Sequence, residues 1–261
     1  MPKSTVGPMV REWRTRRHRS QLDVALDVGM STRHLSFVET GRSRPSPELL
    51  LLIADRLEVP LRERNALLLA AGYAPRFSHA ALDEPAMGRA RAALQRMLDA
   101  HDPYPGVVVD RQWNVVLANR GAGALTALLP TALTSPTVNV YRACLHPDGL
   151  ARFTVNFAAW ADSLLGQLRR SLLLSADPAL DALLTEVCGY PNVAPLLERP
   201  PAGDGEPELL VPVVLEPEPG RRLSMFTTLT SFGAPGDVTL DELAVELFYP
   251  ADDSTEAALR G

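Results

Sequence analysis

The sequence predicts an all-α N-terminal domain followed by an α+β domain in which helices pack on an antiparallel sheet. Three observations support this fold class. Apolar residues recur with helical spacing from Pro8 to about Leu69, short β-type runs follow residue 105, and the two parts differ in the sign of their charge. A chain of 261 residues fits one or two compact domains. We place the boundary between residues 80 and 81.

Cap and turn residues divide the N-terminal region into five short helices. The breaks are expected at Ser20, Gly29 with Ser31, Gly41, Pro45 with Pro47, and Pro60. Residues 72–85, GYAPRFSHAALDEP, lose the helical spacing and contain two prolines, so we interpret them as the linker between the domains. A helix is expected over residues 86–100.

The second domain begins with β-type sequence. Residues 107–109 and 113–119 are predicted to form a hairpin, and residues 120–188 return to helical spacing. A loop rich in Pro, Gly and Glu is expected at residues 190–207, followed by strands at 209–215, 223–232 and 243–249. Thr239 and Glu242 also match a helix capping box, but the alternation over residues 244–249 favours a strand there.

Charge is distributed unevenly along the chain. Residues 1–80 carry 13 Lys+Arg and 8 Asp+Glu, a net charge of +5, which leaves −10 for the remainder. This asymmetry predicts that the N-terminal part binds a polyanion. The first residues contain no apolar run typical of a signal peptide, no stretch is long enough to span a membrane, and the only cysteines are Cys144 and Cys188. We therefore expect a cytoplasmic protein with no membrane partner.

Residues 21–41, QLDVALDVGMSTRHLSFVETG, have the spacing of two helices that cross at a tight turn. Ala25 permits close approach, Gly29 supplies the positive φ of the turn, and Ser31 can cap the second helix. An apolar seam is formed by Val24, Val28, Met30, Leu35 and Val38. The residues left facing outward are Thr32, Arg33, His34, Ser36 and Phe37. A run of arginines at positions 11, 14, 16, 17 and 19 adds positive charge beside this face, which favours a nucleic-acid groove as its partner.

This segment resembles the helix-turn-helix of the XRE family of bacterial and phage repressors, and the loop ETGRSRPS behind it is also similar. The resemblance covers roughly residues 8–72. It implies that Gln21 contacts the DNA backbone and that Thr32, Arg33 and Ser36 read bases in the major groove. Arg42 and Arg44 would bind phosphates, and His34 and Phe37 complete the DNA-facing set. The expected partner is an operator in double-stranded DNA, read by a homodimer because one such module reads too few base pairs.

The second domain resembles the ligand-binding domain of MmyB-like regulators. The similar stretches are DPYPGVVVDRQWNVVLAN at residues 102–119, LHPDGLARFTVNFAAWA at 145–161 and VELFYPADDST at 245–255. The resemblance implies a PAS-like fold that encloses a small-molecule pocket between its sheet and its helices. It also implies a small apolar, fatty-acid-like ligand. No other cofactor and no metal is expected.

Ten residues are candidates for lining this pocket: Trp113, Asn119, Tyr141, Phe153, Asn156, Phe157, Trp160, Leu164, Met225 and Thr227. Phe153, Phe157, Trp160 and Leu164 recur at spacings typical of one buried helix face, and Asn156 would place an amide on that face. A buried amide needs hydrogen-bond partners. Asn156 therefore either orients a ligand head group or bonds to the backbone within the core, and the aromatic stripe is either a ligand wall or ordinary core.

We expect no enzymatic activity. The best enzymatic match is to a dinucleotide-binding fingerprint, since Gly121 and Gly123 follow a predicted strand, but Thr126 stands at the third glycine position and no βαβ alternation follows. The five histidines lack metal-ligand spacing, and no GxSxG nucleophile elbow is present. Two alternatives stay open. One is a dinucleotide-binding enzyme domain fused to a DNA-binding domain, and the other is a regulator whose second domain only dimerises.

Overall fold

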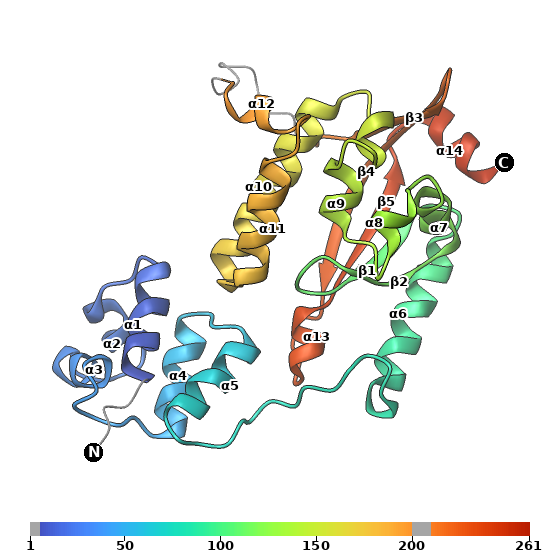
Figure 1. Cartoon of the computed structure of the whole chain (residues 1–261). Helices are drawn as coiled ribbons and strands as arrows, with labels where there is room; N and C mark the ends of the chain where they lie inside the picture. Colours follow the sequence, from blue (N-terminus) through green and yellow to red (C-terminus); the bar gives the residue numbers. More distant parts are fainter. Residues whose placement is uncertain (1–5, 200–209) are drawn as a thin grey trace. The chain divides into compact units, whose positions relative to one another are not determined.

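A computed structural model of the chain describes residues 6–199 and 210–261, which fold into two compact units (Figure 1). The first unit contains the chain up to Ala80 together with Ala234–Asp241, and the second contains Ala81–Gly233 and Glu242–Gly261. Residues 234–241 lie in sequence between two strands of the second unit. Their membership of the first unit was not anticipated from the sequence.

The first unit contains the five expected helices: α1 (Val6–Arg16), α2 (Gln21–Asp27), α3 (Thr32–Glu39), α4 (Pro47–Arg56) and α5 (Leu61–Ala70). Serine caps begin three of them. The hydroxyls of Ser20, Ser31 and Ser46 accept hydrogen bonds from the amides three residues later, at 3.1, 3.1 and 3.2 Å. These contacts satisfy amides that a helix leaves unpaired at its N-terminus, which explains where the helices start.

Residues 234–241 join the first unit through the segment that follows α5. The amide of Val238 donates to the Ser78 carbonyl at 2.8 Å, and the hydroxyl of Thr239 donates to the Ala80 carbonyl at 2.6 Å. The Ser78 hydroxyl in turn donates to the carboxylate of Asp237 at 2.6 Å. A short helix, α13 (Val238–Glu242), starts here. The helix signal near Thr239 and the strand expected after it are therefore both present, in succession.

The second unit is built on a five-stranded antiparallel sheet with the strand order β2-β1-β5-β4-β3. The strands are β1 (Gly106–Val109), β2 (Val115–Ala118), β3 (Val213–Glu218), β4 (Arg221–Ser231) and β5 (Ala244–Pro250). The expected hairpin pairs Val108 with Leu117, which confirms it. The three later strands are also present, although the one expected at residues 209–215 starts only at Val213, and residue 209 lies outside the described residues. The antiparallel sheet with its helices makes this an α+β unit.

Helices cover the sheet of the second unit. The helices and single 3₁₀ turns are η1 (Pro85–Met87), α6 (Gly88–His101), α7 (Arg120–Thr126), α8 (Thr131–Thr134), α9 (Val140–Leu145), η2 (Leu150–Phe153), α10 (Phe157–Ser175), α11 (Pro178–Cys188), α12 (Ala194–Leu197) and α14 (Asp253–Arg260). The main core joins Val107 and Val109 of the sheet to Leu164 of α10 and Leu183 of α11. Helix α6 packs against β1 and β2. Among the described residues, no helix is long and apolar enough to cross a membrane.

Several local expectations were wrong. Phe153 ends η2 and does not belong to the helix of Trp160, because α10 begins only at Phe157. Asn156 precedes α10 and so does not lie on its buried face. Trp113 lies in the hairpin turn, with a φ of 65°, and not in a strand. The expected loop at 190–207 contains α12, and its residues 200–207 lie outside the described residues.

Candidate DNA-binding face and ligand pocket

Helices α2 and α3 form the expected helix-turn-helix. Gly29 adopts a φ of 71° in the turn, a conformation that glycine reaches without a side-chain clash. Ala25 and Leu35 are buried, as are Val24 and Val38, so the apolar seam holds the two helices together. The structure leaves Arg33 and His34 exposed on α3, while Thr32, Ser36 and Phe37 are half-buried.

Arg33 of α3 and Arg42 of the following loop lie on either side of one aromatic ring. The guanidinium of Arg33 lies 5.3 Å from the centre of the Phe37 ring, and that of Arg42 lies 5.8 Å from it. Neither arginine forms an ion pair within the described part of the chain. Beside them, the Ser43 hydroxyl lies 3.5 Å from Nε2 of His34. The guanidinium groups of Arg33 and Arg42 are therefore oriented only by weak contacts with the Phe37 ring, and their charge is available for phosphate or base contacts.

Two other expected DNA contacts are engaged within the unit. The Gln21 side-chain amide donates to Oε2 of Glu39 at 2.7 Å. The guanidinium of Arg44 lies 4.5 Å from the Tyr73 ring centre and donates to the Gly72 carbonyl at 3.3 Å. Both side chains thus hold neighbouring segments together in this structure.

Glu39 is the centre of a buried polar network that the sequence reasoning did not identify. Its carboxylate accepts from Nε of Arg14 at 2.6 Å and from the Gln21 amide, and its side chain is only 2% exposed. This network joins α1, α2 and α3. Hydrogen bonding to Glu39 raises the pKa of Arg14, although burial opposes the shift. The signal available in the sequence was that Glu39 lies four residues after the apolar Leu35, and therefore on the same, buried face of the helix.

The run of arginines at positions 11, 14, 16, 17 and 19 mostly forms contacts within the first unit, which the sequence did not indicate. Arg16 pairs with Glu12 at 2.8 Å, and Arg19 pairs with Asp27 at 2.6 Å. Arg17 donates to the Leu57 carbonyl at 3.0 Å. With Arg14 bound to Glu39, four of the five arginines have partners inside the unit, so the run is weaker support for DNA contact than α3 and its loop.

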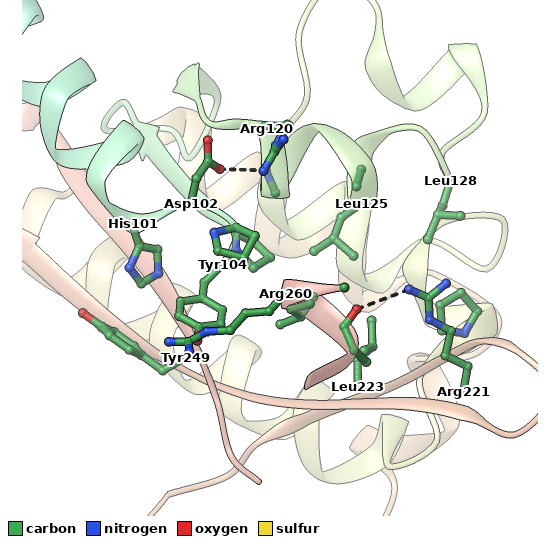
Figure 2. A pocket seen from close by; sticks show the side chains of 18 of the residues that line it. His101, Asp102, Tyr104, Arg120, Leu125, Leu128, Arg221, Leu223, Tyr249 and Arg260 are labelled. Carbon is green, nitrogen blue, oxygen red and sulfur yellow. Dashed lines mark hydrogen bonds between the residues drawn. The ribbon is translucent and has the colours of Figure 1, made fainter. Parts of the chain in front are cut away.

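The second unit contains a pocket of about 1160 Å³, larger than the ~300 to 1,000 Å³ usual for small-molecule sites (Figure 2). Its walls come from the end of α6, from α7, from strands β3, β4 and β5, and from α14. The apolar part includes Leu125, Leu128 and Leu223. Gly121 is required where α7 approaches the preceding chain, because a Cβ there would overlap the carbonyl oxygen of Pro103.

Three arginines from separate elements line this pocket: Arg120, Arg221 and Arg260. Arg260 donates to the Tyr104 hydroxyl at 2.8 Å and pairs with Glu256 at 2.9 Å. Arg221 lies 3.8 Å from the Glu218 carboxylate. Arg120 is exposed and forms no ion pair in the described ranges. Figure 2 shows the Arg260 side chain beside Tyr104 and reaching towards Tyr249.

Comparison with known families assigns both units. Residues 10–64 match the helix-turn-helix family, and residues 90–261 match the family described as MmyB-like transcription regulator ligand binding domain. The second match covers more than half of the chain. The chain belongs to the MmyB-like transcription regulators. A comparison with curated protein sequences found no match.

The ten ligand candidates of this MmyB-like regulator do not line the large pocket. Five of them, Trp113, Tyr141, Trp160, Leu164 and Met225, are buried in the main core, and Phe157 packs against it. Trp113 and Tyr141 meet edge to face, with ring centres 5.1 Å apart. Phe153 is half-buried and lies under the guanidinium of Arg152, at 4.5 Å. Thr227 is half-buried on β4.

The two asparagines bond to the regulator's own backbone. The Asn119 amide donates to the Tyr104 carbonyl at 2.8 Å and accepts from the Gly106 amide at 2.9 Å. Asn156 donates to the Pro212 carbonyl at 2.7 Å and accepts from the Val214 amide at 3.0 Å. Of the two readings left open for Asn156, the structure shows the backbone bonds.

The geometry does not support the dinucleotide alternative for this MmyB-like regulator. Helix α7 follows β2, but every strand pairing in the described sheet is antiparallel, so no βαβ unit is formed. Gly121 packs against Pro103 and does not open a phosphate loop. Both family matches are of the regulator type.

Sequence reasoning missed the residues of the large pocket because α14 was not expected. The signal was present in the sequence, because aspartate is a preferred helix N-cap residue and Asp252 directly precedes α14. In the structure its side chain accepts a hydrogen bond from the Thr255 amide at 2.7 Å. Arg120, Arg221 and Arg260 come from three distant segments of the regulator, and no spacing in the sequence predicts that they meet.

Proposed function

We propose that this regulator binds an operator through α3 and the loop after it, as a homodimer, and that a small acyl-chain anion in the arginine-lined pocket controls its DNA affinity. The pocket carries the ligand part of the proposal. An apolar surface beside three arginines suits a fatty-acid-like molecule, whose chain is driven out of water while its carboxylate is held by guanidinium groups.

Arg120 and Arg221 are the best anchors for the carboxylate. Arg120 is exposed without an ion-pair partner among the described residues, and the 3.8 Å pair of Arg221 with Glu218 is long enough to be replaced by a stronger bidentate contact. Arg260 is already held by Tyr104 and Glu256, so it would contribute mainly long-range attraction. The chain would lie against Leu128 and Leu223.

Reading of the operator is assigned to the exposed part of α3. Arg33 projects from the second position of that helix, where helix-turn-helix proteins contact base edges, and Arg42 follows the helix where a phosphate contact is expected. Two copies would read half-sites about 34 Å apart, one helical turn of DNA, because a single module discriminates too few base pairs.

Two adjacent residues of α13 supply a route between ligand and DNA. Asp241 accepts from the Leu61 amide within the first unit, and Glu242 accepts from Arg111 within the second, at 3.0 and 3.1 Å. The chain on either side runs directly into β4 and β5, which carry Arg221, Leu223 and Tyr249 of the pocket. A ligand that shifts these strands would therefore alter the hydrogen bond between Asp241 and Leu61 at the start of α5. Coupling requires such a contact that differs between the ligand-bound and ligand-free states.

The test is calorimetry of the full chain with saturated fatty acids of increasing length, in parallel with the corresponding alcohols. Acids are expected to bind more tightly than alcohols of equal length, and Arg221→Gln should reduce that preference at least tenfold. Arg169→Gln, an exposed change on α10 away from the pocket, is the matched control. If acids do not bind, or if Arg221→Gln leaves the preference unchanged, the ligand proposal is wrong.

A further inference from the structure

Glu246 is a buried carboxyl that neither DNA binding nor the arginine-lined pocket uses. It lies on β5 opposite Val107 of β1, and the residue is 2% exposed. Interaction with the Thr227 side chain of β4 lowers the pKa of its carboxyl, against the larger opposite effect of burial. One carboxyl oxygen, Oε2, has no hydrogen-bond partner in the described structure. Native interiors rarely leave such an atom unpaired, so its surroundings bear on function.

A cavity of about 60 Å³ adjoins Glu246, between the sheet and helices α7 and α9. Its walls are mostly apolar and come from α7, α9, β1 and β5, with Val107, Val140 and Phe248 among them. Its other polar lining groups are Thr126, whose hydroxyl donates to the Ala122 carbonyl, and the thiol of Cys144. The space accommodates on the order of four water-sized groups, so a molecule of a few heavy atoms fits.

The Cys144 thiol and the Tyr141 phenol near Glu246 are neutral near pH 7. Burial raises the pKa of Cys144 to about 12, and burial also raises the pKa of Tyr141 above its usual value. The positive charge of Arg170 on α10 lowers the pKa of Tyr141, against the larger effect of burial, and does not contribute to the pKa of Glu246. Burial raises the pKa of Glu246 itself to about 7. Within the described chain, the carboxyl therefore faces a small apolar cavity with no cation to neutralise it.

We propose that this cavity binds the ammonium group of a small primary alkylamine, with Glu246 as its counter-ion and the apolar walls around its alkyl chain. An ammonium supplies the hydrogen-bond donor that Oε2 lacks, and its charge compensates a carboxylate that burial otherwise disfavours. The site takes a cation, whereas the arginine-lined pocket takes an anion. The two assignments therefore fail independently.

Calorimetry of the full chain with methylammonium, propylammonium, hexylammonium and propan-1-ol tests the size and the charge of the ligand. Propylammonium is expected to bind most tightly, because methylammonium leaves the cavity part-empty and hexylammonium exceeds it. Propan-1-ol has the same heavy-atom count without the charge and is expected to bind at least tenfold more weakly. Equal binding of the alcohol, or the absence of saturable binding by any amine, would overturn the proposal and leave a cavity filled by water.

The pH dependence tests the counter-ion directly. An alkylammonium keeps its proton below pH 9, so its binding requires the ionised carboxyl and displaces the proton of Glu246 to the buffer. With a carboxyl pKa of about 7, roughly 0.9 proton per ligand should be released at pH 6 and about 0.1 at pH 8. The affinity should accordingly rise about tenfold over that range. Absence of proton release at pH 6 contradicts the assignment.

Two substitutions complete the experiment. Glu246→Gln keeps the shape and removes the charge, so propylammonium binding should weaken at least tenfold and lose its pH dependence. Glu198→Gln, which removes an exposed carboxyl of the same unit, is the matched control. Ala143→Val narrows the cavity without changing charge and should weaken binding of propylammonium more than that of methylammonium. Unchanged binding in Glu246→Gln overturns the proposal.

Discussion

The carboxylate of Asp241 accepts a hydrogen bond from the backbone amide of Leu61, 3.0 Å away and 180 residues earlier in the chain. Helix α5 begins at Leu61 after Pro60, which forms no side-chain cap. Asp241 therefore supplies from a distant segment the cap that the local sequence lacks, and its negative charge lies at the positive end of the helix dipole. The DNA-binding unit is thus completed by residues from between β4 and β5.

Asp241→Ala is expected to lower the free energy of unfolding of the first unit by about 1 kcal/mol, the usual loss for a removed N-cap. Chemical denaturation of the full chain measures the loss of unfolding free energy, and hydrogen exchange of the α5 amides shows whether the loss lies in that helix. Asp83→Ala removes an exposed aspartate outside the first unit and should change little. Unaltered protection of the Leu61 amide in Asp241→Ala would show that the contact contributes nothing.

Glu39→Ala is expected to destabilise the first unit by about 3 kcal/mol, because it leaves the mostly buried guanidinium of Arg14 without its partner. Glu12→Ala breaks an exposed pair with Arg16 and should cost no more than about 0.5 kcal/mol. The double variant Arg14→Ala with Glu39→Ala should lose less than the two single losses added together. Additive losses in equilibrium denaturation would mean that the two side chains do not interact.

Arg33→Ala and Arg42→Ala should affect DNA binding differently. Loss of Arg33 is expected to remove discrimination of about 1 to 3 kcal/mol at one base pair, because it is assigned to a base edge. Loss of Arg42 should weaken all sequences alike and reduce the salt slope by about one. Titrations of operator and scrambled duplexes over a range of salt measure both. Arg16→Ala is the control, and an unchanged ratio of specific to nonspecific affinity in Arg33→Ala would disprove the assignment.

Burial of Glu246 predicts a pH dependence of stability. Its pKa is about 7 in the folded protein against 4.5 in an unpaired side chain, so the folded state binds the proton more tightly. Stability contributed by this group is fully present below pH 4.5 and is lost as the pH rises through 7, by an amount on the order of 3 kcal/mol. The difference in unfolding free energy between Glu246→Gln and the parent should therefore change by that amount between pH 4.5 and 8. A constant difference would contradict the raised pKa.

Local patterns were sufficient where the physical cause is local. Helix starts follow from Ser20, Ser31 and Ser46, whose hydroxyls bond within their own first turn. The turn at Gly29 follows from its positive φ. The ligand candidates fared differently, because periodicity shows that Trp160 and Leu164 are buried but not whether protein or ligand covers them. Asn156 was recognised as a polar group that needs partners, and its partners are backbone groups, as are those of the other candidate asparagine, Asn119.

The sequence by itself determined the two classes of unit, the helix-turn-helix with its exposed arginine face, and the antiparallel strands of the second unit, since each depends on interactions over a few residues. Only the tertiary structure decided that Asp241 caps α5, that Arg120, Arg221 and Arg260 share a pocket, and that Glu246 faces a cavity. These relationships join segments far apart in the chain. Their geometry depends on which elements pack together, and the periodicity of an element shows which of its faces is buried but not which distant segment covers that face.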